Sequence, residues 1–146
     1  MKTKFLIFGL LLTLGISCVE EDEYVTTYTI ENTSSYTIAF NFFSKFNYES
    51  FILEPNEIKK YKNTPRGGFS STFFPFEAVD SIKVTFNDNI SVFHGSTLYN
   101  LKRNLLLKSS FKQVTDKATL REFEYVFTEE DYQEALTHQV RYYHLF

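Results

Sequence analysis

The sequence predicts an all-β fold: a two-sheet antiparallel sandwich with one short C-terminal helix. After residue 23, β-branched and aromatic residues recur with a period of two, which is typical of strands with one buried face. Turn residues separate these segments at short intervals, and one segment near the C-terminus has helical spacing instead. A chain of 146 residues suits one domain with a real core. We therefore expect residues 24–146 to form a single β-sandwich domain.

The first two strands are predicted at residues 24–30 and 36–43. Four apolar side chains of the second segment share one face: Tyr36, Ile38, Phe40 and Phe42. Residues 32–35 read Asn-Thr-Ser-Ser, a composition typical of a hairpin loop. We expect the two strands to pair and to start the sheet.

Further short strands are predicted along the chain, at residues 50–53, 57–61, 81–86, 90–93 and 120–127. Asn87, Asp88 and Asn89 lie between two of them and tolerate the left-handed backbone conformation that a tight hairpin needs. Short strands separated by turns in this way favour a sandwich of two sheets.

The helix is predicted to begin at Thr128. Its hydroxyl can cap the first turn, and the carboxylate of Asp131 can reach back to the cap amide. One apolar stripe should then dock on the sheet, formed by Tyr132, Ala135, Leu136 and Gln139 or Val140. Residues 141–146 are too apolar for a free end, and we expect them to pack, with a closing strand as one form of that packing.

Residues 1–17 have the pattern of a signal peptide. Lys2 and Lys4 precede an apolar run that ends near the small residues Gly15 and Ser17. The run is shorter than the roughly 20 residues that a membrane-spanning helix needs. Taken alone, this segment fits an ordinary secretory signal, and a cysteine that follows it would then be incidental.

The only cysteine, Cys18, lies directly after this segment and cannot form an internal disulfide. Residues 14–18 read Leu-Gly-Ile-Ser-Cys and resemble the lipobox of bacterial lipoproteins. The resemblance implies cleavage before Cys18 and acylation of that residue, so that a membrane becomes the partner of the mature chain. More than one acyl chain holds a protein stably to a membrane without any spanning helix.

Residues 18–23 are expected to form the lipidated cysteine and an acidic tether, since Glu20, Glu21, Asp22 and Glu23 are consecutive acids. This block resembles the acidic signal after the lipidated cysteine of surface-exposed lipoproteins in the Bacteroidota. The resemblance implies the outer membrane, on the cell surface rather than on its periplasmic face.

Looser motifs extend the resemblance over much of the mature chain. They are the Thr- and Asn-rich opening strands, the Asp-Ser-Ile of residues 80–82 leading into Phe-Asn-Asp at 86–88, and residues 125–132, which read Tyr-Val-Phe-Thr-Glu-Glu-Asp-Tyr. Together they resemble small outer-membrane lipoproteins of flavobacteria and their relatives. That group implies a location and no biochemical activity.

Charge and motifs argue against several classes of function. A net charge of -3 offers phosphates no attractive field, so nucleic acid is not expected as a partner. No catalytic motif is present, and His94 before Gly95 and Ser96 is expected to be a solvent-exposed residue at a strand end. We predict no enzyme activity, no catalytic residues and no cofactor.

A metal site is not expected either. His138 and His144 are six residues apart, which does not place them on one helix face. Asp80 and Asp88 lack the ligand spacing of a calcium loop, and a hairpin turn explains Asp88. Glu122 and Glu124 alternate on one strand face, where we expect a solvated surface rather than a glycosidase pair.

The most unusual segment is 63–76, which combines two glycines and two prolines with four phenylalanines. So much apolar surface must either fill the core or form a recognition loop. The residues of that candidate loop are Arg66, Phe69, Phe73, Phe74 and Phe76.

The leading hypothesis is a lipid-anchored protein of the cell envelope that acts as a non-enzymatic binding or structural module, with a protein or glycan as its ligand. The alternative is an inhibitor or immunity-type lipoprotein that blocks a secreted enzyme by inserting a loop. A small hydrolase ranks third.

Overall fold

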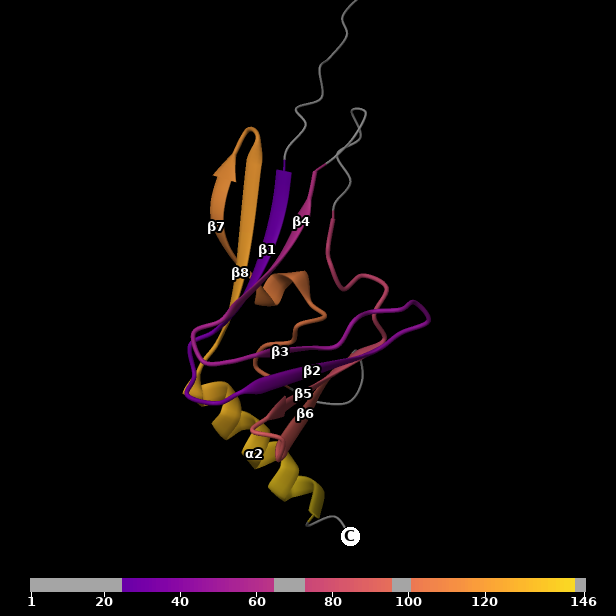
Figure 1. Ribbon diagram of the computed structural model, residues 1–146, viewed down its shortest axis with the longest axis vertical. Coiled ribbons are helices and arrows are strands. Elements are labelled where there is room, and N and C mark those ends of the chain that lie inside the picture. Colours follow the sequence, from indigo (N-terminus) through magenta and orange to yellow (C-terminus); the bar gives the residue numbers. More distant parts are fainter. Residues whose placement is uncertain (1–24, 65–72, 96–100, 144–146) are drawn as a thin grey trace, which may run out of the picture.

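The computed structural model describes residues 25–64, 73–95 and 101–143, with side chains as far as residue 139 (Figure 1). The expected signal peptide, Cys18, the acidic tether, Arg66, Phe69 and His144 lie outside the described residues. The fold is a β-sandwich of two four-stranded sheets with one short C-terminal α-helix, which confirms the fold class predicted from the sequence.

The first sheet, called sheet A, has the strand order β4-β1-β8-β7. Its strands are β4 (Ile58–Asn63), β1 (Val25–Asn32), β8 (Leu120–Phe127) and β7 (Lys112–Lys117). Strands β1 and β8 run parallel, whereas β4 and β7 pair with them in antiparallel fashion. The parallel pair joins the first and last described strands, so sheet A can be completed only after most of the intervening chain has folded.

The second sheet, called sheet B, has the order β3-β2-β5-β6 and is antiparallel throughout. Its strands are β3 (Phe51–Leu53), β2 (Ile38–Phe43), β5 (Ser81–Phe86) and β6 (Ile90–Gly95), and a 3-10 turn, η1 (Lys108–Ser110), precedes β7. Sheet A runs toward the end of the molecule at which β1 begins. Sheet B and α2 (Glu129–Tyr143) lie toward the opposite end (Figure 1).

The expected pairing of the first two strands is wrong. Strand β1 belongs to sheet A and β2 to sheet B, so residues 32–37 cross between the sheets instead of closing a hairpin. Both strands have the pattern that a hairpin requires, but Asn32 is fully buried and holds the crossover in place.

Asn32 satisfies its whole side-chain amide inside the protein. Its Nδ2 donates to the carbonyl oxygens of Tyr36 at 2.8 Å and Leu53 at 3.1 Å. Its Oδ1 accepts from the backbone N–H of Ser34 at 3.1 Å and from the Ser34 hydroxyl at 2.7 Å. The backbone carbonyl of Asn32 also accepts from the N–H of Asn56 at 2.7 Å, which ties the turn between β3 and β4 to the same point.

The hairpin between β5 and β6 has the turn that the sequence predicts. Phe86 pairs with Ile90, and Asn87 and Asp88 adopt left-handed conformations with φ of 46° and 57°. The Asn87 side chain accepts from the N–H of Thr37 at 3.0 Å, so this turn also braces the start of β2.

The secondary structure differs from the prediction at two places in the C-terminal half of the chain. Strand β7 is not predicted, because Lys112–Lys117 is an exposed edge strand that lacks the apolar alternation of a half-buried one. Residues 141–143 continue α2 instead of forming a closing strand. The carboxylate half of the predicted capping box is present, since the Thr128 N–H donates to Asp131 Oδ2 at 2.8 Å. The Thr128 hydroxyl donates to the same oxygen at 3.2 Å instead of accepting from the first turn.

The core between the sheets is built mainly from aromatic rings. Tyr28 stacks on Phe123 with centroids 4.8 Å apart, and Phe40 stacks on Phe51 at 4.4 Å. Ala135 of α2 is fully buried against this core, and Tyr132 and Leu136 pack beside it, which confirms the predicted stripe. Offset and edge-on ring contacts of this kind add to the free energy gained by burial alone.

Replacing Asn32 with Ala should destabilise the fold strongly. The change removes the Asn32 partner from the carbonyls of Tyr36 and Leu53 and from the N–H and hydroxyl of Ser34. We therefore expect the free energy of unfolding to fall by about 3–5 kcal/mol in a urea titration. Asn47→Ala, at an exposed position between β2 and β3, is the matched control and should change it by no more than about 0.5 kcal/mol. Equal stabilities of the two variants would contradict the role of Asn32.

Candidate functional site

His94 is buried, contrary to its expected exposure at a strand end. Its side chain is 3% exposed, and its Nδ1 accepts the backbone N–H of Leu105 at 3.0 Å. The ring proton therefore lies on Nε2. Burial, and secondarily the neighbouring charge of Arg103, lowers the pKa of His94 to about 3, so the ring is neutral at physiological pH. The hydrogen bond from the Leu105 amide thus gives His94 a structural role, in which it fixes the loop that contains Leu105.

Arg103 and Asp131 form an ion pair beside His94. The guanidinium Nη2 donates to Asp131 Oδ1 at 2.6 Å and to the backbone carbonyl of Val126 at 2.8 Å, and the group lies 4.6 Å from the Tyr125 ring centroid. Hydrogen bonding to Asp131 raises the pKa of Arg103 in spite of its partial burial. The Asp131 carboxylate therefore has two roles. It caps the first turn of α2, and through Arg103 it connects the helix to the Val126 carbonyl of β8 in sheet A.

A small cavity of about 10 Å³ lies between these side chains and the underside of α2. Its lining includes His94, Arg103, Asp131 and Glu134. The volume is close to that of one water molecule, and the lining is polar enough to hold it. The cluster therefore holds the helix against the sandwich and leaves no room for a substrate.

The candidate recognition loop is largely drawn into the core where the structure describes it. Phe76 is buried, and Phe73 and Phe74 pack against the core, with Phe74 edge-on to Tyr28 at 5.5 Å. This is the core-filling alternative that its composition allows. Arg66 and Phe69 lie outside the described residues.

The other candidate side chains take part in turns or in contacts with neighbouring side chains. Asp88 occupies the β5–β6 turn, Glu122 accepts from the Thr115 hydroxyl at 2.6 Å, and His138 lies 4.0 Å from Glu134 on the same helix. Among the residues described, no group of three or more acids, histidines or cysteines is placed to hold a metal ion.

The outer surface of sheet B carries residues of a different kind, which the sequence analysis did not single out. We call it the sheet B exterior, and it consists of the outward side chains of the four strands: Ala39, Asn41, Phe43, Ile52, Ser81, Lys83, Thr85, Ser91 and Phe93. Phe43 is 47% exposed and Ile52 58% exposed, and the rings of Phe43 and Phe93 lie 6.0 Å apart. Lys83 is the one charged member of this set.

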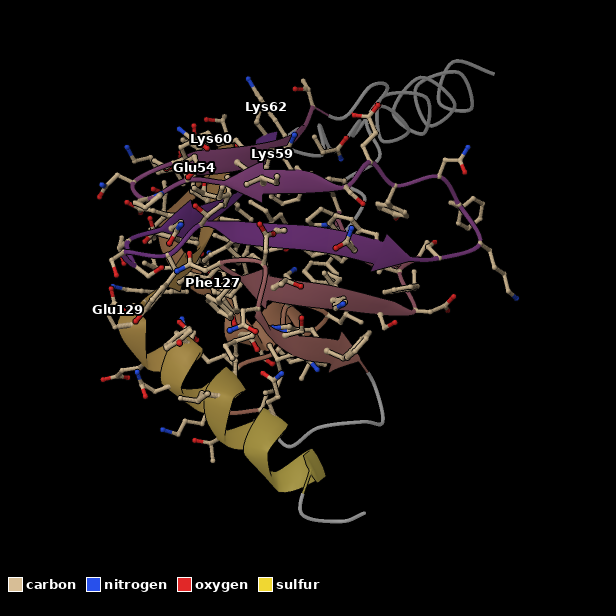
Figure 2. All side chains as sticks on the ribbon, turned by 60° about the horizontal axis from the view of Figure 1, so that its bottom comes forward. Glu54, Lys59, Lys60, Lys62, Phe127 and Glu129 are labelled. Carbon is tan, nitrogen blue, oxygen red and sulfur yellow. The ribbon has the colours of Figure 1, made fainter. Side chains whose placement is uncertain are left out.

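The outer surface of sheet A is the opposite case. One row across it reads Lys60, Thr29, Glu124 and Lys112, and the next places Lys62, Thr27 and Glu122 side by side. Figure 2 shows Lys59, Lys60 and Lys62 along β4, on the side of the molecule opposite to α2. Mixed charges of this density describe a solvated surface, whereas neutral and apolar side chains on an exposed sheet are typical of an interaction surface.

The period-two pattern contains the signal for the sheet B exterior. Once the buried face of each strand is assigned, the alternate positions of residues 36–43 and 81–86 can be examined for charge. The pattern alone does not show that these positions come together, because that depends on the pairing of β2 with β5.

Below pH 6.5, His94 should make the protein less stable. The unfolded histidine has a pKa near 6.5, so between that pH and about 3 the unfolded chain binds a proton that the folded chain excludes. The contribution of His94 to the free energy of unfolding should thus be fully present above pH 6.5. Between pH 6.5 and about 3 the free energy of unfolding should fall by about 1.4 kcal/mol per pH unit as the pH decreases. Urea titrations at pH 7 and 5 should show a smaller decline for His94→Gln than for wild type, and equal declines would contradict this prediction.

Arg103→Leu should loosen α2 without unfolding the sandwich. The change leaves Asp131 without its cation and the Val126 carbonyl without a donor, at a cost of about 2–3 kcal/mol. Hydrogen exchange should become faster at the α2 amides and stay unchanged in β2 and β5. Lys102→Leu, at an exposed neighbouring position, should leave both regions as in wild type. Unchanged exchange in the Arg103 variant would show that the ion pair does not hold the helix.

Comparison with family models, curated proteins and solved structures finds no match to this chain. In the part of the chain that the structure describes, no helix is long and apolar enough to cross a membrane.

Proposed function

We propose that this protein is a non-catalytic binding module of the cell envelope, anchored to the outer membrane through an acylated Cys18 and exposed on the cell surface. The sheet B exterior is the recognition surface, and its ligand is a protein. The observation that carries the proposal is the contrast between the two outer faces, of which only that of sheet B is nearly free of charge.

The position of β1 in the fold supports this assignment. Seven residue steps separate Cys18 from Val25, so the start of β1 can lie at most about 25 Å from the Cα atom of the anchoring cysteine. Sheet B lies toward the other end of the long axis (Figure 1). A chain attached at Cys18 can therefore present the sheet B exterior away from the membrane.

The geometry favours this function over the two alternatives. An inhibitor that inserts the 65–76 segment would need its aromatic side chains at the surface, yet Phe73, Phe74 and Phe76 belong to the core or pack against it. A hydrolase built on His94 would need that ring to reach a nucleophile, whereas its Nδ1 holds the Leu105 amide.

Expression of the wild-type chain and of Cys18→Ser tests the anchor. We expect wild type to sediment with the outer membrane, to lack residues 1–17 by intact-mass analysis and to carry the added mass of its acyl chains. The Cys18→Ser chain cannot form the thioether and should lose both the acyl mass and the membrane association. A wild-type chain that keeps its leader, or whose sulfur is not acylated, would contradict the proposal. Protease treatment of intact cells then reports surface exposure.

A further inference from the structure

Lys83 occupies the middle of the sheet B exterior. Its neighbours across the strands are Asn41 of β2 and Phe93 of β6, both outward-facing. Among the described residues no ion pair involves Lys83, and its side chain stays partly exposed to water. Within the described residues the cation therefore has no carboxylate partner, and it keeps contact with water.

The lysines of sheet A have different surroundings. Lys112 lies directly across from Glu124, and Lys60 lies in the same row beyond Thr29, so the face that carries these lysines also carries a carboxylate. The row of Lys83 supplies no such carboxylate, and the adjacent row reads Ile52, Ala39, Thr85 and Ser91. A ligand that covers this face must remove water from an isolated cation.

Removing that water is costly unless the ligand brings an opposite charge. An occupant made only of apolar groups would leave the ammonium group of Lys83 buried without a partner. The exposed side chains of Phe43 and Ile52, with the half-buried ring of Phe93 beside Phe43, nevertheless favour an apolar contact. The face is thus complementary to an apolar surface that carries one anionic group.

We propose that the sheet B exterior binds a protein segment that places a single Asp or Glu carboxylate on Lys83 and apolar side chains on Phe93 and Ile52. This inference rests on the proposed function and specifies the partner of the same surface. One cation does not suit a polyanion, which needs several. A polypeptide supplies the apolar and anionic groups together.

A selection from a phage-displayed library of random peptides tests the proposal with purified full-length protein. Peptides selected on wild type should share one acidic residue next to apolar or aromatic ones. Lys83→Gln should weaken the binding of a synthetic consensus peptide by about tenfold. Lys83→Glu should select peptides in which Lys or Arg replaces the acid, since the complementary charge is then reversed.

Lys60→Glu is the matched control, because it reverses an exposed strand lysine on the other sheet. It should leave the selected sequences and their affinity unchanged. Phe93→Ser should abolish binding of the wild-type consensus peptide, and circular dichroism should show that each variant is folded.

Several outcomes would overturn the inference. If the selected peptides depend on Phe93 but contain no acid, the surface recognises proteins and the role given to Lys83 is wrong. If no peptide depends on Phe93, the recognition surface itself is wrong, and with it the binding part of the proposed function. Binding of an alginate oligosaccharide that Lys83→Gln removes, with no peptide selected, would assign the site to an acidic glycan. A dimer in sedimentation that Phe93→Ser dissociates would assign the face to a second copy.

Discussion

The full hydrogen bonding of Asn32 is the constraint on which the arrangement of both sheets depends. A chain that crosses from one sheet to the other inside a sandwich must leave ladder hydrogen bonds behind, and buried backbone groups without partners are costly. Asn32 supplies partners to the crossover and to the end of β3 at once. Thr33, the next residue, donates from its N–H and its hydroxyl to the carbonyl of Phe127, so the end of β8 is fixed to the same point. Because α2 begins at Glu129, two residues after Phe127, the same hydrogen bonds also fix the start of the helix.

The sheet edges show why recognition belongs to a face of the molecule. Edge strand β4 carries Lys59, Lys60 and Lys62, and edge strand β7 has a bulge between Gln113 and Thr115. Charged edges and bulges prevent the addition of further strands. Strand β6 is covered by α2, which the Arg103–Asp131 pair holds in place (Figure 2). The fourth edge strand, β3, has only three residues. The large outer surfaces of the two sheets remain, and only the sheet B exterior is nearly free of charge.

Local patterns predicted the elements well, and they failed where partners distant in sequence decide the outcome. Strands at 81–86 and 120–127 and the capped helix follow from periodicity and capping chemistry within a few residues. The pairing of β1 does not, because β4 and β8 supply its neighbours from elsewhere in the chain. The burial of His94 does not follow from its sequence neighbours for the same reason, since the Leu105 amide that donates to its ring comes from a later loop. The sheet B exterior likewise depends on the strand order, because the pairings of β2 with β3 and β5 and of β5 with β6 bring its residues together.

Lys83 also bears on why an exposed neutral face does not simply attract further copies of itself. A stack of two identical faces about a two-fold axis would cover Lys83 of each copy with a face whose strand residues include no carboxylate. The cost of burying two unpaired cations opposes that contact. The same cost disappears for a ligand that brings an acid. One charge in the middle of the face therefore both opposes self-association and favours an acidic partner. Specificity is a difference between two affinities, and it increases when the wrong partner binds less well as well as when the right one binds better.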